Sequence, residues 1–547
     1  MSSYSYRIIF FVSLLIGSIS KLLAQPYSIV LGRPTEQSIT ISALLDLPAD
    51  VYFKYGMQPG FYTDSTIVYS TLPSEPLEAD LVSLVPDSRY FYQMCYRFQS
   101  TTGYTLSPEY TFHTQRSVGS SFTFTIEADE HLYDKKGIPS MYRVTLGNEA
   151  LDQPDFMLSL GDIWGDDHDP DSMSSYVMDT LHRYYRPFLG SICHSIPFYA
   201  CLGNHEGEND YYLAQTPPNN LAAWGTQARK KYFPNPSPSN FYSGNTTVEP
   251  FGIGTPENYY AWTWGNALFV VLDVYRDQCD TSAKPQKWSW SLGQPQYDWL
   301  KAVLDTSASQ YKFVFAHHIN GQGRGGITNA VEFEWGGYNS NHTTYDFPNE
   351  RPGWAAPIHQ LFVNAGVNVF FQGHDHLFAH ETLDGVTYQE VPMPSDSTYE
   401  IGMLANADAY TSDTIGGTGH IRVNVTPQCV TVDFVRAYLP VDTVGGLHQN
   451  REIGFSYTLG SCATNDISVN DAANLYRLYP VPASDRLHVI SPPGKSIKEA
   501  RIFNAMGQCV VVSESTLLNV AELKNGMYFL LIDSSDMHTA KKFIVQH

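Results

Sequence analysis

Residues 196–206, Ile-Pro-Phe-Tyr-Ala-Cys-Leu-Gly-Asn-His-Glu, begin as an apolar run and end in three polar side chains. Residues 156–162, Phe-Met-Leu-Ser-Leu-Gly-Asp, have the same arrangement. A short apolar run bounded by glycine is typical of a buried strand. In open α/β sheets, ligands gather at the carboxyl ends of the strands. We therefore expect the polar residues that follow both runs to meet at one site.

Further apolar runs also end in side chains that can bind metals. They are residues 122–126 before Asp129-Glu-His131, residues 312–316 before His317-His318, and residues 367–371 before Gly373-His-Asp-His376. Apolar residues at helical spacing lie between the runs, over residues 172–189, 296–305 and 357–364. This alternation predicts an α/β domain. Residues 269–273 end in an acid as well, but without a neighbouring histidine, so we expect Asp273 to be structural.

These motifs, in this order, resemble those of the calcineurin-like metallophosphoesterase family: Asp129-x-His131, Gly161-Asp162, Gly203-Asn-His-Glu206, His317 and Gly373-His-x-His376. Gly-Asp alone would carry no signal, and Gly-Asn-His-Glu or Gly-His-Asp-His alone a moderate one, whereas the ordered set is highly specific. The resemblance implies an α/β fold with a four-layer β-sandwich core flanked by helices. We expect this domain over residues 117–440.

Hydrolysis of a phosphate ester needs stabilised phosphoryl oxygens and a nucleophile near neutral pH. Two divalent metal ions about 3.5–4 Å apart supply both, including a bridging hydroxide. Cations so close need an anionic oxygen between them and neutral imidazoles around them. The resemblance implies that Asp162 is the bridge. It assigns Asp129, His131 and His376 to one metal site, and Asn204, His317 and His374 to the other.

The resemblance places His205 against the substrate and not against a metal. There His205, with Asn204, would bind the phosphoryl oxygens, and His205 could protonate the leaving oxygen. His205 and the bridging Asp162 are thus the predicted catalytic residues. Either Glu206 or Asp129 could orient His205, and the sequence does not decide between them.

Two assignments near the fourth motif are less direct. His317 or His318 could be the ligand, and the position of Val314, three residues before His317, matches the family spacing and favours His317. A glycine-rich loop, residues 321–326, follows. Within it, Arg324 is a candidate clamp for the substrate phosphate.

The chain is most similar to the purple acid phosphatase branch of the family. That branch has Gly at the third position of the first motif and a Tyr three residues beyond the bridging Asp, whose phenolate binds ferric iron and gives the colour. This chain has His131 and Gly165 at these positions. We therefore expect a colourless centre, with Mn, Zn or ferrous iron as candidate metals.

Residues 25–116 alternate short apolar strands with turns rich in Pro, Gly and Ser. The expected strands are residues 38–42, 50–55, 77–84, 89–98 and 109–114. This spacing is typical of an antiparallel β-sandwich. Leu84-Val-Pro-Asp-Ser-Arg-Tyr90 resembles the tyrosine-corner region of fibronectin type III domains, so we expect such a domain before the catalytic one.

The end of the chain has the strand and turn pattern of a small β-sandwich over residues 476–547. It resembles the type A C-terminal sorting domain of the Bacteroidetes type IX secretion system through Tyr479-Pro-Val-Pro482, Ala505-Met-Gly507, Gly526-Met-Tyr528 and Lys541-Lys-Phe-Ile-Val545. Val481 replaces the usual Asn. The resemblance implies that the secretion machinery is a partner, and that the protein is released or attached to the cell surface. Residues 441–475 would be the linker.

Residues 1–24 have the pattern of a signal peptide, with Arg7 before a short apolar run and Ala24 at the cleavage point. The alternative, a membrane anchor, needs a run of about 20 apolar residues. We expect no transmembrane segment once these residues are removed. Export permits disulfides, and Cys193 with Cys201 or Cys429 with Cys462 are the open alternatives.

The 547 residues carry 33 Lys and Arg against 55 Asp and Glu, a net charge of −22. Phosphate backbones require dense positive charge, so no nucleic acid partner is expected. The sequence predicts a secreted phosphoesterase that hydrolyses small phosphate monoesters with a metal-bridging hydroxide. The alternatives are a phosphodiesterase or nucleotidase with the same site, and a surface protein that binds without catalysis.

Overall fold

The computed structural model describes residues 25–547 except 166–171, 279–286, 320–322, 402–404, 411–413, 447, 463–475, 492–496, 505–507 and 535–537. The chain divides into two compact units, Met1–Gly460 and Ser461–His547. The predicted signal peptide lies outside the described residues. Among the helices that are described, none is both long and apolar enough to cross a membrane.

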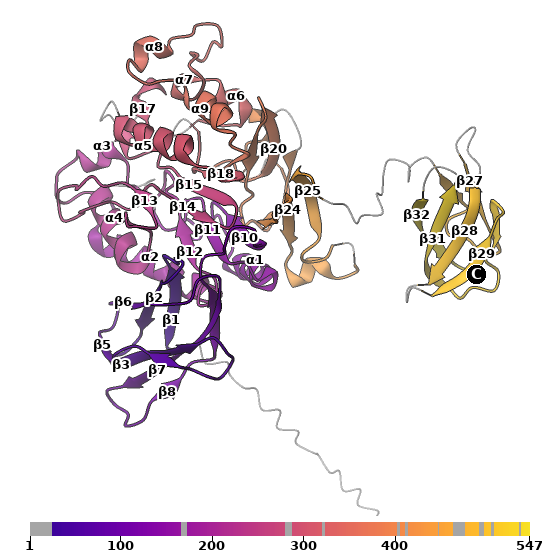
Figure 1. Cartoon of the computed structure of the whole chain (residues 1–547), viewed down its shortest axis with the longest axis horizontal. Coiled ribbons are helices and arrows are strands. Elements are labelled where there is room, and N and C mark those ends of the chain that lie inside the picture. The colour runs from indigo at the N-terminus through magenta and orange to yellow at the C-terminus, as the bar shows by residue number, and fades with distance from the viewer. Residues whose placement is uncertain are drawn as a thin grey trace, which may run out of the picture. The chain divides into compact units, whose positions relative to one another are not determined.

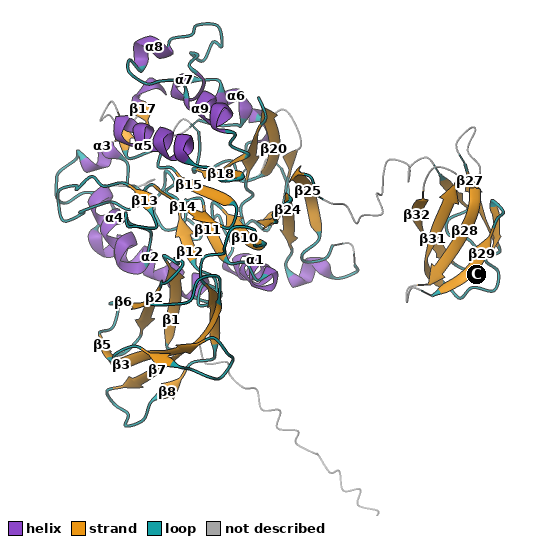
Figure 2. Cartoon of the chain, in the orientation of Figure 1, coloured by secondary structure: helices purple, strands orange, loops and turns teal. Residues whose placement is uncertain are grey.

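Two sheets form the middle of the first unit (Figures 1 and 2). One has the strand order β12-β11-β10-β23-β24-β25. Its strands are β10 (Phe122–Glu127), β11 (Phe156–Ser159), β12 (Phe198–Ala200), β23 (Thr418–Val425), β24 (Cys429–Ala437) and β25 (Ile453–Gly460). Strands β10, β11 and β12 are parallel, so their carboxyl ends lie at the same edge.

The other sheet has the order β13-β14-β15-β18-β19-β21-β20-β22. Its strands are β13 (Ser243–Gly244), β14 (Tyr260–Trp264), β15 (Ala267–Val271), β18 (Tyr311–Phe315), β19 (Val369–Gln372), β20 (Phe378–Leu383), β21 (Val386–Glu390) and β22 (Thr414–Ile415). Strands β15, β18, β19 and β21 are parallel neighbours. The ends of β18 and β19 therefore also lie together.

The inner faces of the two sheets pack against each other through a largely aromatic core. Phe124 and Phe156 of the first sheet stack with ring centroids 5.5 Å apart, and Phe269 of the second lies edge-on to both. Helices α1, α2 and α4 cover the outer face of the first sheet, and α5 and α9 cover the second. These four layers confirm the predicted fold class.

The helices are α1 (Pro139–Asp152), α2 (Ser175–Leu189), α3 (Asp210–Leu213), α4 (Leu221–Tyr232), α5 (Gly293–Thr306), α6 (Ile327–Ala330), α7 (Phe333–Gly336), α8 (Phe347–Glu350) and α9 (Ile358–Ala365). The predicted helix over residues 172–189 begins three residues later, because the Ser174 hydroxyl accepts from the backbone N–H of Val177 and caps α2 there. Helices α1 and α4 were not expected from the sequence.

Residues 27–113 form an antiparallel β-sandwich. One sheet contains β1 (Tyr27–Gly32), β2 (Ile39–Leu45) and β6 (Leu77–Leu81); the other contains β3 (Ala49–Gly56), β4 (Asp64–Ser65), β5 (Tyr69–Thr71), β7 (Arg89–Phe98), β8 (Thr105–Leu106) and β9 (Tyr110–His113). The Tyr90 hydroxyl accepts a hydrogen bond from the backbone N–H of Val85 at 2.9 Å. This upstream contact is the one that a tyrosine corner makes.

This sandwich packs against the central domain of the first unit. Val30 and Leu44 belong to the same buried cluster as the side chains under α1 and α2. The guanidinium of Arg186, fully buried on α2, donates to hydroxyl and carbonyl oxygens of Ser28 and Ser42 and to the carbonyl of Tyr232. Burial lowers the pKa of Arg186 to about 10. The sandwich therefore has a buried cluster of its own and also shares a second cluster with the central domain.

The first unit extends further than the predicted domain boundary at residue 440. Residues 453–460, which the prediction places in the linker, form β25 at the edge of the first sheet. The reason is packing, because Phe455, Tyr457 and Leu459 lie against the aromatic core. A disulfide joins Cys429 to Cys462 just beyond β25. Cys193 and Cys201, the alternative pair, are both free and buried.

The second unit is a small β-sandwich with its own core. Its strands are β26 (Arg477–Tyr479), β27 (Arg486–Ile490), β28 (Ile497–Asn504), β29 (Cys509–Ser513), β30 (Leu517–Asn519), β31 (Gly526–Ser534) and β32 (His538–Val545). They form the sheets β26-β27-β30 and β29-β28-β31-β32. Leu487, Ile502 and Leu530 are fully buried between them.

Candidate metal centre

Five strand ends carry the predicted ligands, as the sequence indicates. The turn after β10 carries Asp129 and His131, and the turns after β11 and β12 carry Asp162 and Asn204. From the second sheet, β18 leads to His317 and β19 leads to His374 and His376. Side chains separated by up to 247 positions in sequence thereby converge, and all but the partly buried His376 are buried.

The backbone at this site is unusual. Five predicted ligands, Asp129, His131, Asp162, His374 and His376, have φ between 44° and 81°. This left-handed region costs roughly 1–2 kcal/mol for a residue with a side chain. The two sheets hold these turns in a conformation that directs successive side chains into one space.

Glycines allow the turns to approach one another. Gly161 has a φ of 108°, and a Cβ there would overlap the backbone of Gly203. A Cβ on Gly203 would in turn overlap Asp162, and one on Gly373 would lie 2.6 Å from an oxygen of Asp129. The glycine that precedes the ligand in three motifs is therefore required by close packing of the turns.

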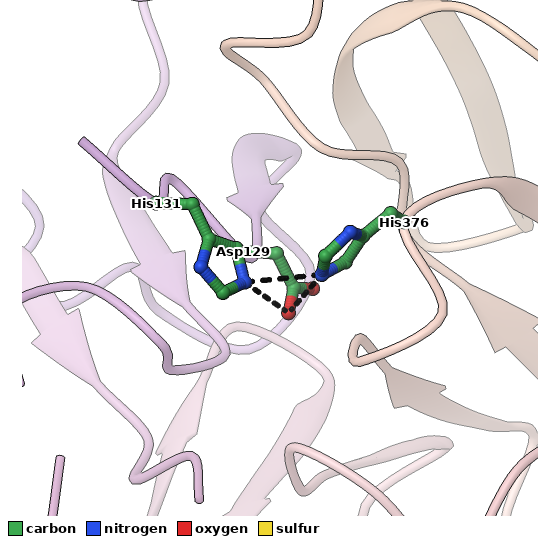
Figure 3. A group of neighbouring side chains, drawn as sticks. All are labelled: Asp129, His131 and His376. Carbon is green, nitrogen blue, oxygen red and sulfur yellow. Dashed lines mark hydrogen bonds and ion pairs between the residues drawn. The ribbon is translucent and has the colours of Figure 1, made fainter. Parts of the chain in front are cut away.

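The first group of metal-capable side chains consists of Asp129, His131 and His376 (Figure 3). The Nε2 atoms of the two histidines lie 3.0 Å apart, and they lie 3.8 and 3.4 Å from Oδ1 of Asp129. On its other side, Nδ1 of His131 lies 3.3 Å from Asp134 and 3.0 Å from the Tyr133 hydroxyl. Such partners fix the ring so that Nε2 faces the group.

The second group consists of Asp162, His317 and His374. Nε2 of His317 lies 3.2 Å from Oδ2 of Asp162 and 3.2 Å from Nδ1 of His374. Nδ1 of His317 lies 3.0 Å from the carbonyl of Leu160, a contact that leaves Nε2 for a metal. Asp162 also forms a group with His131 and His205, so its carboxylate lies between the two predicted metal sites.

The chemistry of these side chains fits divalent cations. Oδ1 of Asn204 and Oδ1 of Asp129 are buried without a hydrogen-bond partner in the described part of the chain, an arrangement that costs free energy unless a cation binds there. Although burial opposes protonation, Asp162 and Asp129 raise the pKa of His317 to about 9. These carboxylates thus attract positive charge.

His205 faces the same carboxylate from the solvent side. Its Nε2 lies 3.7 Å from Oδ2 of Asp162, and its side chain is 13% exposed, against 1% for Asp162. The backbone N–H of His205 donates to Oδ1 of Asp162 at 2.8 Å. A side chain in this position can reach a molecule that enters from solvent.

The structure gives Glu206 a different role from the one considered in the sequence. Its carboxylate accepts hydrogen bonds from the backbone N–H groups of Gly203, Asp162 and Ile163 at 2.6–2.9 Å. It therefore ties the third motif to the second. The short-range pattern of the sequence does not reveal this role, since it depends on how two strands pair.

His317 belongs to the second group, whereas His318 lies outside all three groups of metal-capable side chains in the described residues. His318 is fully buried, and its ring centroid is 5.0 Å from that of His374. Asp273 accepts from the backbone N–H groups of Tyr275 and Arg276 and from the side chain of Asn258. These contacts agree with the structural role expected for Asp273.

Arg324 lies against the loop that carries the last two predicted ligands. Its Nη1 donates to the carbonyl of His374 at 2.8 Å and to Oδ1 of Asp375 at 2.9 Å. Asp375 is fully buried and also accepts from Gly325 and Tyr410. Asp375 was not expected from the sequence, since the partners of its carboxylate all lie more than 30 positions away.

Gly165 stands where a purple acid phosphatase has its tyrosine. A Cβ at this position would overlap the backbone of His205 and Glu206. The third motif therefore fills the space that a side chain at residue 165 would need. This packing agrees with the expected lack of a tyrosine ligand.

Comparisons with known proteins agree with this geometry. Residues 122–378 match the family model of calcineurin-like phosphoesterases, and residues 477–546 match that of a secretion system C-terminal sorting domain. No curated protein matches the chain. The central domain is thus that of a metal-dependent phosphoric ester hydrolase, and the tail indicates type IX secretion to the surface or exterior of a Bacteroidetes-like bacterium.

Two solved structures share the fold. PhoD is 17% identical, with a TM-score of 0.55, over 79% of this chain and 90% of that chain. A purple acid phosphatase from yellow lupin (Lupinus luteus) seeds is 14% identical, with a TM-score of 0.52, over 79% of this chain and 74% of that chain. At these identities the likeness concerns the fold.

Proposed function

Since residues 122–378 match the calcineurin-like phosphoesterases, we propose that this protein hydrolyses small phosphate monoesters at a centre of two divalent cations. The observation that carries the proposal is the convergence of three groups of metal-capable side chains, with Asp162 in two of them. Asp129, His131 and His376 would hold one cation, and Asn204, His317 and His374 the other. Asp162 would contact both. Mn, Zn and Fe are the candidates.

When bound, divalent cations supply a water nucleophile near neutral pH and neutralise charge on the phosphoryl oxygens. The residues of the chain would supply the negative charge of the site, bind the substrate and donate a proton. Asp162 and Asp129, both buried, give the site its negative charge. His205, with Nε2 3.7 Å from Asp162 and its ring partly exposed, is placed to bind a phosphoryl oxygen with Asn204 and to give a proton to the leaving oxygen.

The remaining parts of the chain receive supporting roles in this proposal. Residues 1–24 would direct export, residues 25–116 would be a fibronectin type III-like part of the catalytic unit, and residues 476–547 would be read by the type IX machinery. Small phosphate esters suit an acidic protein, because the net charge of −22 repels polyanions at long range.

The test compares Asp162→Asn with Asp273→Asn. Both residues follow a strand and are buried, but only Asp162 lies in the metal-capable groups. Asp162→Asn should lower bound metal, measured by elemental analysis, and abolish hydrolysis of p-nitrophenyl phosphate with an unchanged circular dichroism spectrum. Asp273→Asn should keep its metal. Phosphate release by Asp162→Asn at the wild-type rate would refute the mechanism.

A substrate panel separates the proposal from its alternatives. The wild-type protein, treated with chelator and reloaded with Mn, Zn or ferrous iron, is assayed with p-nitrophenyl phosphate, its bis-ester and nucleotides. Preference for the bis-ester or nucleotides would replace the monoester assignment, and no hydrolysis at all would favour a binding protein. The iron-loaded protein should show no tyrosinate absorption band in the visible range.

A further inference from the structure

Asp375 links three loops next to the candidate centre. It is 0% exposed and lies in the turn that carries the last two predicted ligands. Oδ2 of Asp375 accepts from the backbone N–H of Gly325 at 2.8 Å and from the hydroxyl of Tyr410 at 2.8 Å, and Oδ1 accepts from Arg324 at 2.9 Å. Its own N–H donates to Glu390 at 3.0 Å. The carboxylate of Asp375 is therefore a fixed anchor.

Arg324 is attached to this anchor by one nitrogen. Nη1 makes both of its hydrogen bonds, to Asp375 and to the carbonyl of His374, and the side chain is 47% exposed. Within the described residues, Nε and Nη2 donate no hydrogen bond. A cation with open donors thus lies beside a predicted metal ligand.

A guanidinium held at one nitrogen presents its other donors in a fixed plane. This planar fork matches the oxygens of a phosphate, which it binds with two parallel hydrogen bonds. Because Asp375 already restricts the rotamers of Arg324, less entropy is lost when the remaining donors bind a ligand. The geometry suits recognition of an anionic oxygen close to His374.

Phosphate monoesters and diesters differ in the number of terminal, anionic oxygens that such a guanidinium could bind. A monoester has three terminal oxygens and a charge of about −1.5 to −2 at pH 7, whereas a diester has two terminal oxygens and a second organic group. We propose that Arg324 determines specificity by binding the terminal oxygen that only a monoester has. This inference rests on the proposed function and deepens it, because it makes monoester preference a property of one side chain.

The main test measures kcat/KM for p-nitrophenyl phosphate and for bis(p-nitrophenyl) phosphate in wild type, Arg324→Ala and Arg324→Lys. A charge-assisted hydrogen bond is expected to account for about 10- to 100-fold in kcat/KM. Arg324→Ala should lose that factor for the monoester and change less than about threefold for the bis-ester. Arg324→Lys, which keeps the charge but not the fork, should fall between.

Arg422→Ala is a matched control. Arg422 is also an arginine that pairs with a buried carboxylate, Asp152, and its side chain is 21% exposed. It lies on β23, outside the residues of the candidate centre, so the ratio of the two kcat/KM values should stay at the wild-type value. Elemental analysis of each variant checks that metal content is unchanged.

Binding of inorganic phosphate, measured by calorimetry on the metal-loaded protein, gives a readout besides hydrolysis. Arg324→Ala should weaken phosphate binding about as much as it lowers monoester turnover. Equal loss for monoester and bis-ester, or unchanged phosphate binding, would overturn the inference. If wild type hydrolyses neither ester, the proposed function fails, and phosphate binding alone then decides whether Arg324 recognises the anion.

Discussion

Two small β-sandwiches precede and follow the central domain in the chain, and they differ in how each relates to a core. The N-terminal one, residues 27–113, contributes Val30 and Leu44 to the core of the catalytic unit. The C-terminal one forms a compact unit, residues 461–547, around its own apolar cluster. We therefore expect the central domain to need the N-terminal sandwich for folding and activity. We expect the C-terminal sandwich to be removable without loss of either.

Truncation gives the largest contrast between the two. Removal of residues 25–116 should abolish cooperative thermal unfolding of the central domain, because it exposes apolar side chains under α1 and α2. A chain that ends after Cys462 should keep its melting temperature and its hydrolysis of p-nitrophenyl phosphate. Calorimetry and phosphate release measure both. A folded, active protein without residues 25–116 would show that the sandwich is an accessory.

The disulfide joins Cys429 to Cys462, two residues past Gly460, where the first unit ends. Replacement of both Cys429 and Cys462 by Ala opens a loop of about 34 residues and should lower the free energy of unfolding by about 4 kcal/mol. Only the transition of the first unit should shift in calorimetry. Cys509→Ala, which changes an exposed free cysteine in the second unit, is the control. A shift of the second transition instead would contradict the boundary at residue 460.

Arg186 tests the attachment of the N-terminal sandwich. Arg186→Met keeps much of the side-chain volume but removes the donors to the buried oxygens of Ser42 and Tyr232, so we expect a loss of about 3 kcal/mol. Chemical denaturation measures it. Arg97→Met, on the same sandwich, breaks a surface pair with Asp50 and should change stability by less than about 1 kcal/mol. Similar losses in both variants would remove the special role of Arg186.

His194, at the same interface, makes a contribution to the free energy of unfolding that depends on pH. Its carbonyl accepts from the Tyr92 hydroxyl at 2.6 Å, and its ring stacks on Tyr110 at 4.1 Å. Burial lowers the pKa of His194 to about 4 from its ordinary value of 6.5. The unfolded chain therefore binds a proton first as the pH falls. Stability from this group is complete above pH 6.5 and decreases towards pH 4 by at most about 3 kcal/mol.

The comparison of wild type with His194→Phe isolates that term. Phenylalanine keeps a ring against Tyr110 and cannot titrate in this range. The free energy of unfolding of wild type, relative to that of His194→Phe, should fall steadily from pH 6.5 to pH 4. A difference that is constant across this range would show that His194 does not couple the interface to pH.

The sequence predicts the residues of the candidate site better than the helices and loops around them. Each ligand follows an apolar strand directly, so the motif and the strand end are local signals, and Asp129, Asp162 and His317 converge as expected. Helix α1 was missed because its buried face carries Asn148 and Glu149, the latter accepting from Thr125, and so lacks an apolar stripe. Local periodicity cannot report a polar buried face.

Contacts between distant segments account for most of what sequence could not supply. The role of Asp375 depends on Gly325 and Tyr410, which belong to other loops. The choice between the two cysteine pairs depends on β25, a strand whose surroundings are polar in sequence. In each case the contact that decides the outcome joins segments that the fold brings together. The local pattern of one sequence does not specify which segments these are.

The left-handed backbone at Asp129, His131, Asp162, His374 and His376 has a consequence for transplanting such a centre. Copying these side chains onto another scaffold with ordinary helical or extended dihedrals would place the same atoms in different directions. A designer would have to reproduce the turns first, with the glycines that let them touch, and only then the ligands. The portable unit is the set of five turns and the two sheets that hold them.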